Sequence, residues 1–177
     1  CVAVLRRLAD EGLHANTTLL GESVRDPAEA EAVAEEYGRI LERLHSEELP
    51  CNVALKLTHL GLELDEELAH ANVERVVQVA ERLQSFVRID MEQSSVLDAT
   101  LRIYRRLREA GHERVGTVLQ SYLYRTEGDL EALRPKLHEV RASSFTDPEG
   151  FYLLAAYLSK AGAHDEALEI LDQSVRD

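Results

Sequence analysis

Side chains able to do chemistry stand near the ends of apolar runs in this chain. Asp90 and Glu92 directly follow the apolar run from Phe86 to Ile89, and Lys56 interrupts a second apolar run. Both runs are predicted to be buried strands. Acids and a lysine at the ends of neighbouring strands are groups that hold and orient a polar ligand, or that stabilise each other.

A lysine inside a buried strand is costly unless an opposite charge pairs with it. Asp90, on the neighbouring predicted strand, is the expected partner of Lys56. Two interpretations of that pair stay open, because spacing alone does not separate them. The pair could only fix the fold, or it could form part of a functional cleft. Glu22 and Gln120 stand near the ends of two further apolar runs and would join such a cleft.

The elements that must position these side chains alternate between strand and helix. The strand-like runs are residues 13–20, 52–60, 85–91 and 114–123, and the helical patterns are residues 26–44, 65–83, 95–110 and 127–137. Four β/α units in a row predict a parallel sheet with covering helices, either doubly wound or as half of a (β/α)8 barrel. In both folds functional residues gather where the strands end.

Helix boundaries carry their own signals. Asp26 is predicted to cap the first of these helices, with Pro27 at its first position, and Gly111 is predicted to end the third. Ser94 and Ser95 are interpreted as the N-cap of that third helix. They are not expected to be nucleophiles, because no strand–turn–helix elbow motif surrounds them.

The pattern changes after about residue 140. Residues 147–177 contain two helical stretches around Gly162 and no strand, so the sequence predicts a β/α domain at 1–140 and a helical hairpin at 147–177. The hairpin resembles one tetratricopeptide repeat. The residues that carry this resemblance are Leu154, Ala155, Gly162, Ala167 and Leu171. Three or more such repeats are normally needed to bury a core.

Composition narrows the classes of partner and location. The chain has 177 residues and a net charge of -13, which disfavours binding to nucleic acid. Its two cysteines cannot build a disulfide framework, and its seven histidines form no metal-binding motif, so a cytoplasmic protein without a metal site is expected. No apolar run approaches the roughly 18 residues of a membrane span, and no signal peptide is visible. The first residue is Cys, as expected of a fragment.

Four motifs carry a family resemblance. "LLGES", "ALKLTHLGL", "FVRIDMEQS" and "VGTVLQSYLYRTEGDL" follow one another within residues 3–138. In this order and spacing they resemble the successive strand motifs of the proline dehydrogenase family. The resemblance implies a partial (β/α)8-type barrel of about four parallel β/α units, here followed by the α-helical hairpin. It also implies FAD as cofactor, oxidation of L-proline to 1-pyrroline-5-carboxylate, and a membrane quinone as electron acceptor.

The resemblance also implies roles for individual residues. Lys56 and Asp90 match residues of the proline site, and Glu22 matches a glutamate that pairs with an arginine over the substrate. Gln120 matches a glutamine that hydrogen-bonds the flavin ring. Asp90 would also face the flavin, because its position looks out over the flavin and substrate pocket. Arg141 matches an arginine that contacts the flavin from the fifth strand. A protein of this family would work in the cytoplasm at the periphery of the inner membrane, where its quinone lies.

The chain departs from the family pattern at several points. Thr18 stands where the family usually has an aspartate, and no "KGAY" follows Arg141. The "YxxRR" arginines that hold the proline carboxylate are absent, which leaves Glu22 without a visible partner. The sequence therefore predicts an incomplete enzyme that is inactive alone and needs self-association or a complementing half-barrel chain. The alternative is a non-enzymatic interaction scaffold that uses the C-terminal hairpin.

Overall fold

A computed structural model describes residues 1–120, 123–132 and 168 of the chain. They belong to two units, Cys1–Val118 and Leu119–Asp177, and each unit is described by itself. Apart from Leu168, the predicted hairpin at 147–177 lies outside the described residues.

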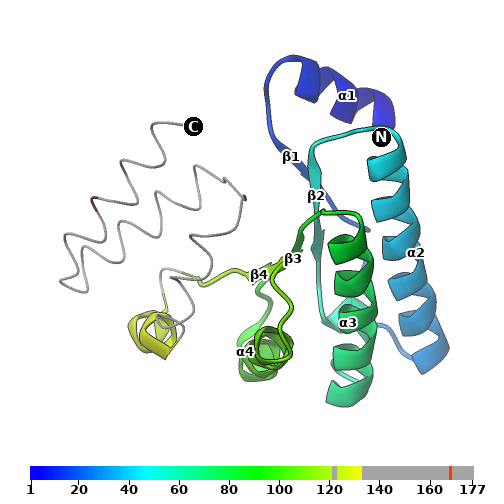
Figure 1. Ribbon diagram of the computed structural model, residues 1–177. Coiled ribbons are helices and arrows are strands. Elements are labelled where there is room, and N and C mark those ends of the chain that lie inside the picture. The colour runs from blue at the N-terminus through cyan, green and yellow to red at the C-terminus, as the bar shows by residue number, and fades with distance from the viewer. Residues whose placement is uncertain (121–122, 133–167, 169–177) are drawn as a thin grey trace. The chain divides into compact units, whose positions relative to one another are not determined.

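The first unit is built on one parallel sheet (Figure 1). Its strands are β1 (Ala15–Thr17), β2 (Cys51–Leu55), β3 (Val87–Ile89) and β4 (Val115–Thr117). They lie side by side in the order β1-β2-β3-β4, and every neighbouring pair is parallel. A doubly wound sheet reverses its strand order at a switch point, whereas barrel strands follow one another around the sheet. The observed order confirms the prediction of about four barrel-type β/α units.

Helices connect these strands. The described helices of the first unit are α1 (Val2–Asp10), α2 (Pro27–Ser46), the short η1 (Thr58–Leu60), α3 (Glu66–Arg82) and α4 (Ser94–Glu109). Crossovers between parallel neighbours are right-handed as a rule, which puts α2, α3 and α4 on one face of the sheet, where α3 contacts both α2 and α4. α1 has no counterpart among the predicted elements. None of the described helices combines the length and the apolarity that crossing a bilayer requires.

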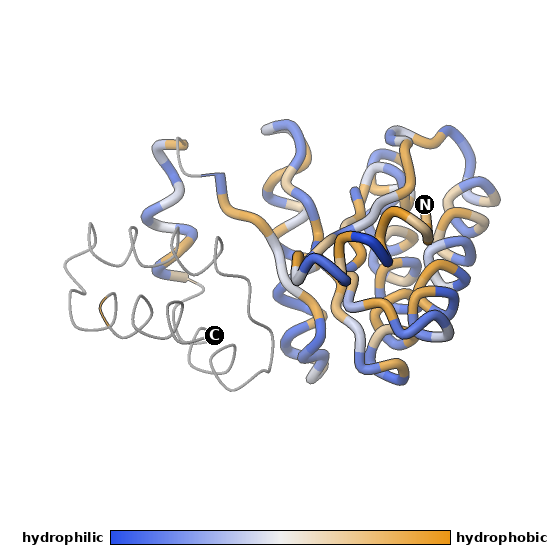
Figure 2. Tube along the Cα trace, turned by 90° about the horizontal axis from the view of Figure 1, so that it is seen from above, coloured by the Kyte–Doolittle hydropathy of each residue, from blue (hydrophilic) through white to orange (hydrophobic). Residues whose placement is uncertain are grey.

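The core lies between the sheet and these helices. Figure 2 shows hydrophobic and hydrophilic residues alternating along the helices, so that each helix has an apolar side to bury. Strand residues in register point the same way and are buried; they are Val53, Leu55, Val87, Ile89 and Val115. Tyr37 and Leu41 of α2 and Val73 and Val77 of α3 are fully buried. Burial of such side chains stabilises the fold by about 1.5–3 kcal/mol each.

The opposite face of the sheet differs in character. Ala54, Arg88 and Gly116 stand side by side in register on β2, β3 and β4. Side chains alternate along a strand, so these three share the face away from the helices. The Arg88 side chain therefore stands between two small residues.

Helix boundaries follow the predicted signals with one exception. The Asp26 side chain accepts a hydrogen bond from the Glu29 backbone N–H at 2.9 Å, which confirms it as the N-cap of α2. Gly111 follows the end of α4 with φ +94°, as predicted. The predicted serine cap of α4 is wrong. The N-cap is Gln93, whose side chain makes no cap bond, and Ser94 is already helical.

The second unit is described over residues 119–120, 123–132 and 168. Residues 126–132 are helical, which confirms the described part of the helix predicted at 127–137. Arg125 and Asp129, one turn apart, form an ion pair with an Nε–Oδ2 distance of 2.7 Å. The rest of the predicted helix lies outside the described residues.

Candidate site at the carboxyl ends of the strands

The two inner strands end just before the charged residues that the sequence singles out. β2 ends at Leu55 and β3 at Ile89, so Lys56 and Asp90 are each the first residue after a strand. The Asp90 backbone N–H still donates to the Leu55 carbonyl at 2.8 Å, which keeps the two strand ends level. The Lys56 side chain is 41% exposed. The predicted placement of Lys56 inside a buried strand is therefore wrong, and with it the need for a buried partner.

Lys56 pairs with Glu22, not with Asp90 as predicted. The Lys56 Nζ donates to the Glu22 Oε2 at 2.7 Å. Glu22, expected to lack a partner, therefore has one. This hydrogen bond lowers the pKa of Glu22 and raises the pKa of Lys56. The ion pair is fully formed at any pH between the pKa of Glu22 and the pKa of Lys56. It is lost when acid protonates Glu22 or when alkali deprotonates Lys56.

Asp90 has a different partner, Arg88. The Arg88 Nε donates to the Asp90 Oδ1 at 2.8 Å, and both side chains are about one-third exposed. The two residues are two positions apart, so they lie on the same side of β3 and its extension. Sequence reasoning missed Arg88, although its spacing from Asp90 was the available signal.

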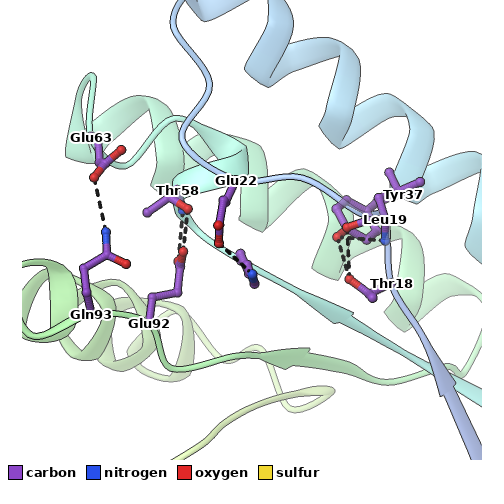
Figure 3. A network of polar contacts seen from close by, with 9 residues as sticks. Thr18, Leu19, Glu22, Tyr37, Thr58, Glu63, Glu92 and Gln93 are labelled. Carbon is purple, nitrogen blue, oxygen red and sulfur yellow. Dashed lines mark hydrogen bonds and ion pairs between the residues drawn. The ribbon is translucent and has the colours of Figure 1, made fainter.

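Glu92 ties two loops together (Figure 3). One carboxylate oxygen accepts from the Thr58 backbone N–H at 3.1 Å, and the other accepts from the Thr58 hydroxyl. The next residue also links the segment after β3 to the segment after β2: the Gln93 Nε2 donates to the Glu63 Oε1 at 3.2 Å. The acids that follow β3 thus have separate tasks: Asp90 holds Arg88, and Glu92 fixes the segment after β2.

Removing the hydroxyl of Thr58 is expected to destabilise the first unit. Thr58 is 1% exposed, so Thr58→Val leaves the Glu92 carboxylate without one of its donors, at a cost of about 1–3 kcal/mol. Thr100→Val is the matched control. Thr100 is fully buried, and among the described residues its hydroxyl has no hydrogen-bond partner, so its loss is expected to be neutral or stabilising. Urea unfolding of both variants measures the difference, and equal midpoints would contradict it.

The two other predicted site residues are Gln120 and Arg141. Gln120 belongs to the second unit, where its carbonyl accepts from the Leu123 N–H at 3.2 Å and from the Thr126 hydroxyl at 2.5 Å. Both hydrogen bonds are made by the backbone carbonyl of Gln120, so its side-chain amide takes part in neither. Arg141 lies outside the described residues.

The first unit thus presents two half-exposed ion pairs at one end of its sheet, Glu22 with Lys56 and Arg88 with Asp90. Each cation faces a carboxylate, so the four charges sum to zero. Such an arrangement suits a polar or zwitterionic ligand, which can exchange partners with the pairs, better than a strongly charged anion.

Three comparisons relate the chain to known proteins. A family model described as proline dehydrogenase matches residues 1–142. Proline dehydrogenase 1 of Bacillus subtilis is 37% identical over 145 residues, which cover 80% of this chain and 48% of that protein. Proline dehydrogenase of Deinococcus radiodurans is 35% identical over 149 residues, again 80% and 48%. The chain therefore spans about half the length of these relatives.

A solved structure shares the fold. The crystal structure of proline utilization A from Bdellovibrio bacteriovorus, inactivated by N-propargylglycine, superposes with a TM-score of 0.68 at 21% identity. The match covers 78% of this chain and 18% of that protein. At this identity the likeness concerns the fold of the β/α units.

Proposed function

Because the chain belongs to the proline dehydrogenase family, we propose that its β/α units form part of a flavin-dependent barrel that oxidises L-proline to 1-pyrroline-5-carboxylate. The observation that carries the proposal is the set of charged residues at the carboxyl ends of three consecutive parallel strands, β1 to β3. Enzymes with this architecture build their sites at that end of the barrel.

Proline is a zwitterion, and the two ion pairs suit it. Asp90 would face the positive nitrogen of proline, and Lys56 would face its carboxylate once the contact with Glu22 is shared. The pairs keep these side chains charged and oriented before the substrate arrives, which lowers the reorganisation needed on binding. Cations beyond those paired here would have to come from another part of a complete barrel.

Proline dehydrogenases are in general flavoproteins. On the sheet face away from the helices, Arg88 is the residue that would meet the ring, because its side chain is about one-third exposed, whereas Ala54 is buried and the Phe86 ring lies against Gly116. By the family resemblance, Gln120 would donate a hydrogen bond to the polar edge of the flavin. The bound flavin would supply the electron acceptor for the oxidation. The chain's own residues bind and orient proline and the ring.

Visible absorbance during an FAD titration of the purified chain tests this proposal. We expect a saturable shift of the flavin spectrum. Gln120→Leu is expected to weaken binding, because the ring loses a hydrogen-bond partner. Gln78→Leu, at an exposed position of α3, is the matched control and is expected to bind like the unaltered chain.

Absence of a spectral shift from a chain that is folded by circular dichroism would contradict flavin binding. The interaction-scaffold alternative would then lead. Equal binding by the Gln120 and Gln78 variants would contradict only the role of Gln120. The further partners of the proposal are a complementing half-barrel segment or a second copy of the chain, and a quinone at the periphery of a membrane as electron acceptor.

A further inference from the structure

Glu22 sits on a segment that has no regular secondary structure. Residues 18–25, here called the β1–α2 segment, connect β1 to α2. Leu20 in this segment is fully exposed, so no hydrophobic contact holds its side chain. Near its end, the Val24 N–H donates to the Thr58 carbonyl at 3.3 Å. That contact fixes one side of Glu22, and another contact must fix the other side.

The ion pair between Glu22 and Lys56 is too weak to order the segment by itself. Both side chains are well exposed, at 60% and 41%. Exposed ion pairs contribute little to stability, whereas fixing the backbone of several residues is costly. The position of Glu22 must therefore be set by groups that are buried, and the pair then forms because its members are already close.

A buried tyrosine meets the start of the segment. Tyr37 of α2 is 0% exposed, and its hydroxyl contacts two consecutive residues (Figure 3). The Leu19 backbone N–H donates to the Tyr37 hydroxyl oxygen at 3.3 Å, and the Thr18 hydroxyl lies 3.3 Å from the same oxygen. Burial raises the pKa of Tyr37, so the hydroxyl keeps its proton at neutral pH.

Counting protons fixes the direction of these bonds. The Thr18 hydroxyl donates its single proton to the Leu19 carbonyl at 3.2 Å. It must therefore accept from Tyr37, whose own proton is otherwise unused. Tyr37 donates to Thr18, Thr18 donates to the Leu19 carbonyl, and the Leu19 N–H donates back to Tyr37. The three residues form a closed cycle of hydrogen bonds, here called the Tyr37 cycle.

The Tyr37 cycle stands three residues before Glu22, and the contact between Val24 and Thr58 stands two residues after it. Between them the backbone is pressed against η1, because a Cβ at Gly21 would overlap the His59 ring. The chain therefore has little freedom in where it presents Glu22. Cutting the cycle removes the restraint on the β1 side.

We propose that Tyr37 is a positioning residue which, through the Tyr37 cycle, holds Glu22 against Lys56. The relevance of this contact to catalysis rests on the proposed function, but the contact between Glu22 and Lys56 forms without flavin or proline. Tyr37 touches no reacting group. It acts only by fixing the path of the β1–α2 segment.

An NMR titration of the Glu22 side-chain carboxyl carbon in the full chain tests the proposal. In the unaltered chain the midpoint is lowered by Lys56. Lys56→Met supplies the midpoint of an unpaired Glu22. Tyr37→Phe keeps the buried ring and removes only the hydroxyl, and its midpoint is expected to move up toward that of Lys56→Met. Thr18→Val cuts the same cycle at an exposed residue and is expected to move the midpoint in the same direction.

Tyr104→Phe is the matched control, because Tyr104 is also buried but lies on α4. Tyr104→Phe is expected to leave the Glu22 midpoint unchanged. A shift caused only by losing the hydroxyl of any buried tyrosine would also appear in this variant. An unchanged midpoint in Thr18→Val, with Lys56→Met shifted, would overturn the proposal even if Tyr37→Phe does not fold. Failure of the FAD titration would overturn the proposed function and leave this result standing.

Discussion

Mixed with FAD and L-proline under anaerobic conditions, the 177-residue chain alone is expected to show no bleaching of the flavin. Lys56, the cation proposed to face the proline carboxylate, is shared with Glu22, Arg88 is paired with Asp90, and the further cations of the site would come from another part of a complete barrel. A bound proline carboxylate needs charge-assisted hydrogen bonds, each contributing about 1.5–3 kcal/mol. If two of these hydrogen bonds to the proline carboxylate are missing, the affinity for proline falls on the order of 100-fold or more. Any loss of substrate orientation would add to this.

The complementary experiment supplies the missing half. A carboxyl-terminal half taken from Bacillus subtilis proline dehydrogenase 1, co-expressed with the chain, is expected to restore bleaching. The same mixture with Lys56→Met is the control and is expected to lose it. Bleaching by the chain alone would show that its own residues complete the site, and the half-barrel account of the function would then be wrong.

Gly61→Ala is expected to destabilise the first unit by about 2–5 kcal/mol. Gly61 ends η1 with φ +98°, in the left-handed region, where a side chain costs about 1–2 kcal/mol. A Cβ there would also lie 2.9 Å from the Leu68 Cδ2 and 3.2 Å from the Ala30 Cβ. Overpacking of this kind adds about 1–3 kcal/mol. Chemical denaturation monitored by circular dichroism measures the sum.

Gly111→Ala separates the two causes. Gly111 has nearly the same backbone angle, φ +94°, but a Cβ there would meet nothing within 4 Å. Only the conformational cost, about 1–2 kcal/mol, is expected. If the two variants lose the same stability, the crowding between α2 and α3 at Gly61 contributes nothing and the close packing described there is wrong.

The helices could be predicted closely because their signals are local. The cap at Asp26 and the glycine at 111 act on backbone groups within a few residues, so the sequence next to them suffices. The strands were predicted too long. The run 52–60 is apolar throughout, yet β2 ends at Leu55 and residues 58–60 turn into η1. Periodicity does not report where an apolar run leaves a sheet.

The partners in the candidate site depend on contacts between distant parts of the chain. Lys56 and Asp90 were correctly predicted to lie on adjacent strands, although Lys56 follows its strand rather than lying inside it, but adjacency did not decide the pairing. Arg88 reaches Asp90 from the same strand, and Glu22 arrives from 34 residues before Lys56. The path of the β1–α2 segment decides which acid meets the lysine. That path depends on the Tyr37 cycle, which no single stretch of sequence reveals.

The strictly consecutive order of the strands has a consequence for how the protein is made. Each new strand of the first unit pairs with the strand synthesised just before it, across one helix-containing crossover. Closing such loops takes less entropy than joining remote segments, and folding rates rise as contacts become more local. The sheet can therefore grow one β/α unit at a time as the chain leaves the ribosome, with β4 as the growing edge.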